Sequence, residues 1–137
     1  MKFEDLHIGD TLGPLELFVS KDQTRAYARS GGLDAPRFTD DEGAKKEGLP
    51  GMILPGNMSL GLLAKLVTDW IGVSGARMVR LGTTYRVPVQ PDHTLTLSGF
   101  VTNAAPGERI VEIDVWIENE DAERLVTGTA SVQFPSA

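Results

Sequence analysis

The sequence predicts an α+β domain in which a curved antiparallel sheet wraps around one central helix. Two observations lead to this prediction. Residues 55–70 read as a helix that is apolar around most of its circumference, and four segments within residues 77–134 alternate between apolar and polar side chains. A helix that is apolar on most sides must be buried on most sides. The chain of 137 residues is too short to surround this helix with further helices, so strands must cover it.

The central helix carries one narrow stripe of small or polar residues. These residues recur every four positions and are Asn57, Gly61, Lys65 and Asp69. Residues four apart lie on the same face of a helix, so we expect Lys65 and Asp69 to pair or to mark the exposed edge. The helix should end near Ile71 and Gly72.

Turn and capping residues divide the segment before the central helix. In order, it contains a strand at 12–19, a helix from Ser20 to Gly31, a loop at 33–38, a polar helix from 39–42 to Gly48, and a loop at 49–54. Ser20 with Gln23 forms a capping box for the first helix, and Thr39 with Glu42 does the same for the second. We predict a loop at 33–38 because this segment contains a proline and its apolar residues recur with neither the helical nor the strand spacing.

Four strand candidates follow the central helix, at 77–87, 94–102, 109–118 and 125–134. In the third candidate, apolar and acidic residues alternate with the period of two that is typical of a half-buried strand. Turn residues separate the candidates at 91–92, 106–107 and 119–121. We therefore expect a strand, helices and then a four-strand meander, all within one domain spanning 1–137.

The composition argues against several classes of function. The net charge of −6 disfavours nucleic acid as the main partner, because phosphate binding needs a basic face. The chain has no cysteine and only two histidines, His7 and His93, so we expect no metal site and place both histidines at the surface. The first residues are acidic, unlike a signal peptide, and no apolar run reaches the ~20 residues that span a bilayer. We expect a cytoplasmic protein with no membrane partner.

Several short strings stand in an order that carries a family resemblance. They are Phe3-Glu4-Asp5-Leu6 with Gly9-Asp10, Ser30-Gly31, Ile53-Leu54-Pro55-Gly56-Asn57-Met58, and Tyr85-Arg86-Val87-Pro88-Val89 followed by Thr94-Leu95. Over nearly the whole chain they resemble the MaoC-like branch of the hot-dog fold, the family of (R)-specific enoyl-CoA hydratases and related dehydratases. The resemblance implies a hot-dog fold and an acyl-CoA or other acyl-thioester ligand. It implies no cofactor beyond the coenzyme A of that substrate.

The catalytic signature of that family, S-G-D-x-N-P-x-H, is not intact in this chain. In three registers its aspartate and histidine positions hold Gly32 and Arg37, Leu33 and Phe38, or Asp34 and Thr39. Hydration of a conjugated thioester needs a base for water, an acid for the α-carbon and donors for the enolate oxygen. A site that keeps only the donors binds thioesters better than it hydrates them.

We expect these donors where the central helix begins, at Gly56, Asn57 and Met58. The first amides of a helix have no intrahelical acceptor, and the helix dipole favours negative charge there. Gly56 either allows close approach of a ligand or serves a plain turn, and Asn57 either caps the helix or directs its amide at the thioester. We predict all three as substrate-binding residues.

The loop before the polar helix holds the remaining candidates. Asp34 is the only carboxylate of this loop, where the family keeps its catalytic acid, and we expect it either to act as a desolvated acid or base or to cap a turn. Arg37 pairs with a ligand or with Asp40 or Asp41, and Phe38 fills the place of the missing histidine or shapes an acyl pocket. We predict Asp34 and Arg37 as catalytic and Phe38 as substrate-binding.

Three functions remain open. The leading one is an acyl-thioester-binding protein, by resemblance a hydratase, a dehydratase or a divergent relative. The second is a non-catalytic subunit that pairs with an active MaoC-like chain, and the third is a thioesterase in which Asp34 or Asn57 positions water. A lone curved sheet leaves an unpaired edge, so we expect a homodimer, or a heterodimer with a paralogue, that also covers Trp116 or its neighbours.

Overall fold

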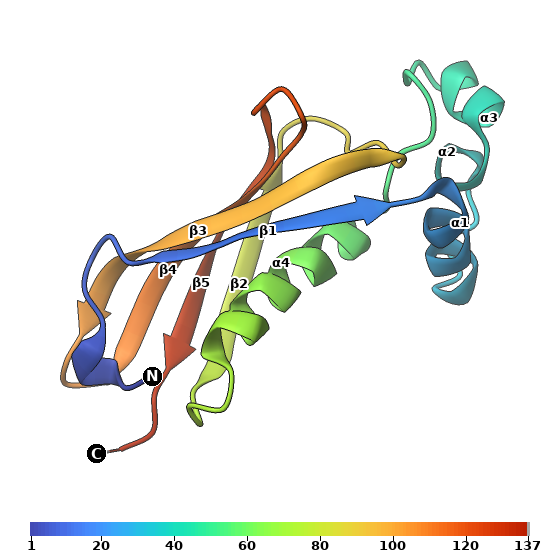
Figure 1. Ribbon diagram of the computed structural model, residues 1–137. Helices are drawn as coiled ribbons and strands as arrows, with labels where there is room; N and C mark the ends of the chain where they lie inside the picture. The colour runs from blue at the N-terminus through green and yellow to red at the C-terminus, as the bar shows by residue number, and fades with distance from the viewer. Residues whose placement is uncertain (137) are drawn as a thin grey trace.

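The computed structural model describes residues 1–136, which form one sheet and a set of helices. In order, the elements are the short helix η1 (Phe3–Asp5), β1 (Thr11–Val19), α1 (Lys21–Ser30), α2 (Pro36–Thr39), α3 (Asp41–Lys46), α4 (Gly56–Ile71), β2 (Arg77–Tyr85), β3 (His93–Ala105), β4 (Ile110–Glu118) and β5 (Arg124–Gln133). Helix α4 lies along one face of the sheet, and α1, α2 and α3 gather beyond the end opposite the two termini (Figure 1). None of the helices in this described part is long and apolar enough to cross a membrane. The predicted α+β fold is confirmed.

The five strands form one antiparallel sheet in the order β1-β3-β4-β5-β2. Strands β3, β4 and β5 form the predicted meander, but β2 pairs with β5 and not with β3, so the four-strand meander is wrong. The connection 86–92 holds Pro88 and Pro91, and proline cannot donate to a strand ladder. It therefore crosses the end of the sheet instead of forming a tight hairpin (Figure 1).

Helix α4 packs one apolar stripe against the sheet. The buried large side chains of this stripe are Leu63, Leu66, Val67 and Ile71. The predicted polar stripe is exposed, and Lys65 and Asp69 form an ion pair at 2.9 Å. Leu60 and Ala64, between the two stripes, are only half-buried. This chain alone therefore covers α4 mainly on its sheet side, and the expectation that it buries the helix on most sides is wrong.

The segment between β1 and α4 follows the prediction in part. Ser20 Oγ accepts the Gln23 N–H at 3.0 Å and Gln23 Oε1 accepts the Ser20 N–H at 2.8 Å, which confirms the first capping box. Helix α3 is capped by Asp40 and not by Thr39, because Thr39 ends α2. Helix α2 itself replaces a predicted loop. Its Pro36 stands at the first helical position, where the missing N–H would have no intrahelical acceptor.

Trp116 of β4 already has apolar contacts within the single chain. The Phe100 ring meets it edge-on at 5.9 Å between centroids, and the guanidinium carbon of Arg124 lies 3.9 Å from the centre of its ring. Its Nε1 donates to Glu118 Oε1 at 2.7 Å. Trp116 is therefore already half-buried within the single chain, and its coverage by a partner subunit stays a prediction.

Candidate functional site

A pocket of about 300 Å³, named here the α4 pocket, opens where α4 begins. It is lined by Arg37, Phe38, Ile53, Leu54, Gly56, Ser59, Tyr85, Arg86, Val87, Pro88 and Val89. Most of this wall is apolar, and no carboxylate or imidazole of the described residues lines it. Two backbone hydrogen bonds join its sides, from Ile53 N to Arg37 O at 3.0 Å and from Leu54 N to Val89 O at 2.7 Å. Such a wall suits an acyl chain better than it suits proton transfer.

The first turn of α4 offers unpaired backbone donors beside the pocket. The N–H groups of Met58 and Ser59 donate to Pro55 O at 2.9 and 3.3 Å. The N–H groups of Gly56 and Asn57, at the first two helical positions, have no acceptor within residues 1–136. Unpaired amides at the positive end of a helix dipole stabilise negative charge on a carbonyl oxygen. This turn is therefore able to polarise a thioester carbonyl.

Tyr85 lies against Gly56 at the rim of the pocket. Its Oη donates to Gly56 O at 2.8 Å, and 51% of the residue is exposed. A Cβ atom at position 56 would lie 3.1 Å from the Tyr85 ring carbon Cζ, which is tighter than ordinary van der Waals contact. Gly56 does not have a positive φ angle, so the turn alone does not require glycine there. A side chain at this position would instead require the exposed Tyr85 ring to shift by a few tenths of an ångström.

Two of the three predicted residues in segment 34–38 reach the α4 pocket. Phe38 and Arg37 line it, and the Arg37 guanidinium carbon lies 4.9 Å from the Phe38 ring centroid. Arg37 pairs with Glu47 at 3.2 Å, not with either predicted aspartate. Asp34 is exposed and does not line the pocket, so the expected desolvation of Asp34 is wrong for this chain alone. Its catalytic role stays a prediction.

The predicted residues at the helix start are divided in the same way. Gly56 lines the pocket, whereas Asn57 and Met58 do not. Pro55 occupies the capping position, so the alternative that Asn57 caps the helix is wrong, and Asn57 is exposed. Met58 is half-buried against the core. The substrate-binding roles of Asn57 and Met58 stay predictions.

Asp41 anchors the loop that forms one wall of the pocket. Its Oδ2 lies 2.8 Å from Lys21 Nζ, and its Oδ1 accepts the Met52 N–H at 2.9 Å. The Lys21 ammonium and the Met52 amide hold the pKa of Asp41 below its ordinary value. Because the folded pKa is lowered, this contribution to stability is complete above the unfolded-state pKa and is lost as the pH falls through the folded-state pKa. The loop is therefore anchored at neutral pH.

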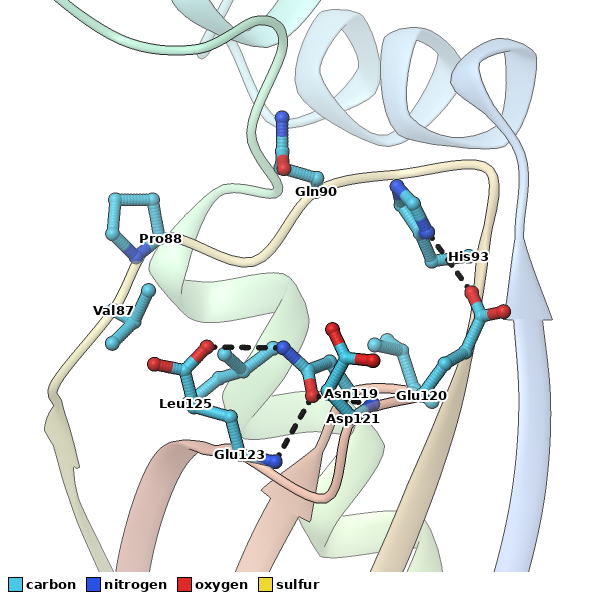
Figure 2. A pocket seen from close by; sticks show the side chains of 10 residues that line it. Val87, Pro88, Gln90, His93, Asn119, Glu120, Asp121, Glu123 and Leu125 are labelled. Atoms are coloured by element: carbon cyan, nitrogen blue, oxygen red, sulfur yellow. Dashed lines mark hydrogen bonds and ion pairs between the residues drawn. The ribbon is translucent and has the colours of Figure 1, made fainter.

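A second pocket of about 320 Å³, named here the acidic pocket, lies beside the same connection 86–92. Val87 and Pro88 line both pockets. Figure 2 shows these two residues facing the loop between β4 and β5 across the acidic pocket. The connection is therefore a wall shared by the two pockets.

The loop opposite that wall carries the negative charge of the acidic pocket. Glu120 Oε1 lies 2.9 Å from His93 Nδ1 and accepts the Thr94 N–H at 3.2 Å (Figure 2 shows the first contact). The bond to His93, followed by that to Thr94, lowers the pKa of Glu120. Asp121 and Glu123 line the same pocket. These carboxylates repel an anionic ligand, so the α4 pocket is the candidate site.

Sequence reasoning did not assign Ser59, Tyr85 or Arg86 to the site. Tyr85 and Arg86 reach it because β2 ends beside the start of α4, and this proximity is set by the pairing of β2 with β5. Ser59 is different, because the sequence did hold a signal: it is a hydroxyl residue within the apolar part of the helix. A polar side chain that is buried among apolar neighbours needs a hydrogen-bond partner.

The sequence matches the family model described as MaoC like domain over residues 5–122. No curated protein matches it. Among solved structures, the chain is similar to the (R)-hydratase from A. caviae involved in PHA biosynthesis, with 20% identity and a TM-score of 0.87 over 96% of this chain and 99% of that one.

Two further similar structures are complexes from Mycobacterium tuberculosis. A chain of the ChsH1-ChsH2 complex is 24% identical, with a TM-score of 0.84 over 94% of this chain and 98% of that one. A chain of the C-terminally truncated HadBC (3R-hydroxyacyl-ACP dehydratase) complex is 19% identical, with a TM-score of 0.77 over 97% and 100%. With the structure from A. caviae, they establish the hot-dog fold.

Proposed function

Because the chain belongs to the MaoC-like domain family, we propose that it binds an acyl thioester, in the first place acyl-CoA, in the α4 pocket. The thioester carbonyl lies at the N–H groups of Gly56 and Asn57, and the acyl chain lies against the apolar wall that includes Phe38 and Leu54. No cofactor enters beyond the coenzyme A of the ligand. The observation that carries the proposal is the wall itself, which combines apolar side chains with nearby unpaired amides.

The rim of the pocket offers a cation for the phosphates of coenzyme A. Arg86 is exposed and lines the pocket, next to Tyr85. Guanidinium groups bind phosphate through charge-assisted hydrogen bonds, which are roughly twice as strong as neutral ones. The proposal therefore places the nucleotide end of the ligand outside the pocket, toward Arg86.

The test is a calorimetric titration of the purified chain with butyryl-CoA. We expect saturable binding, and we expect Arg86→Gln to weaken it about tenfold, since hydrogen bonds to charged groups contribute about 1.5–3 kcal/mol. The matched control is Arg80→Gln, which removes an exposed arginine of β2 that does not line the pocket. Butyryl-pantetheine, which lacks the nucleotide, should bind both variants equally.

Two outcomes would contradict this proposal. Absence of butyryl-CoA binding to the folded chain would remove the proposed function. Release of free thiol from butyryl-CoA during the titration would show that the chain hydrolyses the thioester. The proposed function would then be that of a thioesterase and not that of a binding protein.

A second function, a subunit that binds the acyl group while an active partner chain supplies the chemistry, has an observation in its favour. The pocket wall lacks the acid–base pair, and two of the similar structures are complexes of differently named chains, ChsH1 with ChsH2 and HadB with HadC. In such an assembly this chain contributes the apolar pocket, and the partner contributes the missing carboxylate and imidazole.

Both functions call for a dimer, and the free edge of β2 is the place we propose for its contact. The other edge strand, β1, contains Pro14, which has no N–H to donate and so disfavours pairing with another strand. We expect a dimer in sedimentation at micromolar concentration, and we expect Val79→Glu on β2 to dissociate it. Val73→Glu, which changes an exposed valine in the loop before β2, should leave the dimer intact. A monomeric parent chain would defeat this prediction.

A further inference from the structure

The hydroxyl of Tyr85 is bonded to the peptide group that joins Gly56 to Asn57. Tyr85 Oη donates to Gly56 O at 2.8 Å. A trans peptide group is planar, and it holds the carbonyl of one residue and the N–H of the next residue on opposite sides of one C–N bond. Gly56 O and the Asn57 N–H are therefore the two polar ends of a single rigid unit.

The bond from Tyr85 is additional to the bonds that form the helix. A carbonyl in an α-helix accepts the N–H group four residues further on, and its oxygen has two lone pairs. Gly56 is the first residue of α4, and the Tyr85 hydroxyl reaches its carbonyl from strand β2. The helix itself therefore does not require this tyrosine.

Strand pairing and the glycine together hold the Tyr85 hydroxyl in place. Tyr85 is the last residue of β2 and pairs with Val126 of β5. The next two N–H groups of the chain donate to Leu125 O at 2.9 and 3.1 Å. A Cβ atom at position 56 would lie 3.1 Å from Tyr85 Cζ and 3.2 Å from its Oη, so the ring lies directly against the glycine. The free chain already has this arrangement.

A hydrogen bond to the carbonyl end of a peptide group strengthens the donor at its other end. Hydrogen bonds in a chain polarise one another by about 10–30% per bond. The Asn57 N–H has no acceptor within residues 1–136, and it lies on the first turn of α4, beside the α4 pocket. This N–H is therefore the open end of a hydrogen-bond chain that begins at the Tyr85 hydroxyl.

We propose that Tyr85 is a positioning residue of the α4 pocket, whose hydroxyl orients and polarises the peptide group of Gly56 and Asn57 and so strengthens the hydrogen bond from the Asn57 N–H to a thioester carbonyl. This proposal rests on the proposed function, because it needs a thioester oxygen at that N–H. Tyr85 acts through the peptide group and does not itself contact the carbonyl oxygen of the ligand.

A purely steric role for Tyr85 makes a different prediction. Tyr85 is 51% exposed and lines the pocket next to Arg86, so its ring could simply narrow the rim. Tyr85→Phe keeps the ring and removes only the hydroxyl. A steric role predicts no change in the polarisation of the bound thioester in this variant, whereas the proposed role predicts a smaller polarisation.

The experiment measures the infrared stretching band of the thioester carbonyl in butyryl-CoA, labelled with carbon-13 at that carbon. We expect the parent chain to lower the frequency of this band on binding, and Tyr85→Phe to reduce the lowering by about 10–30%. The affinity should change by less than about tenfold, because the ligand keeps all its direct contacts. The control is Thr84→Val, which removes an exposed hydroxyl of β2 that does not line the α4 pocket, and it should keep the parent frequency.

A second measurement needs no ligand. The amide nitrogen-15 resonance of Asn57 responds to hydrogen bonding at the carbonyl of the same peptide group. Tyr85→Phe should therefore shift this resonance in the free chain, and Thr84→Val should not. If Tyr85→Phe fails to fold, 3-fluorotyrosine in place of Tyr85, a stronger donor of similar size, should lower the carbonyl frequency further than the parent tyrosine does.

The outcomes separate this proposal from the proposed function. Equal carbonyl frequencies in the parent chain and in folded Tyr85→Phe, or an Asn57 resonance that does not move, would overturn the role of Tyr85 alone. Binding of butyryl-CoA by the parent chain with no lowering of the carbonyl frequency would also overturn it. Absence of butyryl-CoA binding to the parent chain would overturn the proposed function and this proposal together.

Discussion

The purified chain is expected to hydrate crotonyl-CoA at least about 100-fold more slowly than a MaoC-like hydratase that keeps the S-G-D-x-N-P-x-H signature. A positioned general acid or base contributes typically about 10²–10⁴-fold in rate. The α4 pocket has Phe38 and Arg37 in its wall and no carboxylate or imidazole among its described lining residues. The loss of absorbance of the conjugated thioester measures the rate, and butyryl-CoA binding on the same sample shows that the pocket is intact.

The second prediction tests whether Asp34 catalyses any residual hydration by this chain. It remains our catalytic candidate because it is the only carboxylate of its loop, although the structure places it at the exposed surface. Asp34→Asn should remove residual turnover and leave the melting temperature and butyryl-CoA affinity unchanged. Unchanged turnover in Asp34→Asn would rule out this role and favour the subunit function. Hydration by the parent chain at the rate of an intact relative would contradict the inference that the catalytic acid–base pair has been lost.

Leu63→Ala is expected to lower the free energy of unfolding by about 2–5 kcal/mol. Leu63 is 0% exposed and lies on the stripe of α4 that packs against the sheet. Truncation removes its apolar contacts and leaves a cavity under the helix. The matched control is Thr68→Ala, at an exposed position of α4 next to the polar stripe, for which we expect a change within about 0.5 kcal/mol. Chemical denaturation followed by circular dichroism measures both, and equal effects would contradict the assignment of the two stripes.

The helices and strands were predictable where a periodic pattern of apolar and polar residues, or a helix-capping residue, determines them. The polar stripe of α4, the ion pair of Lys65 with Asp69 and the capping box at Ser20 all depend on residues three or four positions apart. Strand order depends on pairing between distant segments. The prolines of the connection 86–92 argue against a tight hairpin, but they do not specify that β2 pairs with β5, which breaks the predicted meander.

The site was predictable to a similar extent. Gly56 stands in a string that resembles the family, Phe38 stands in the segment where the family keeps its catalytic signature, and both line the pocket. Helix α2, which carries Phe38, was missed because a single turn is too short for a period and its proline favoured a loop. The contact of Tyr85 with Gly56 joins residues that are far apart in the sequence, and it follows from the strand order. Ser59 was visible in the sequence, but its unpaired state depends on the surrounding packing.

The connection 86–92 belongs to the walls of two pockets at once. Val87 and Pro88, which line both the α4 pocket and the acidic pocket, are named here the partition. The partition is tied to β5 by Arg86 N and Val87 N, which donate to Leu125 O at 2.9 and 3.1 Å, and to the opposite wall by Leu54 N and Val89 O. A displacement of this partition therefore changes the walls of both pockets together. Under the proposed function, an acyl group that moves Val87 or Pro88 would also alter the wall of the pocket that Glu120 lines.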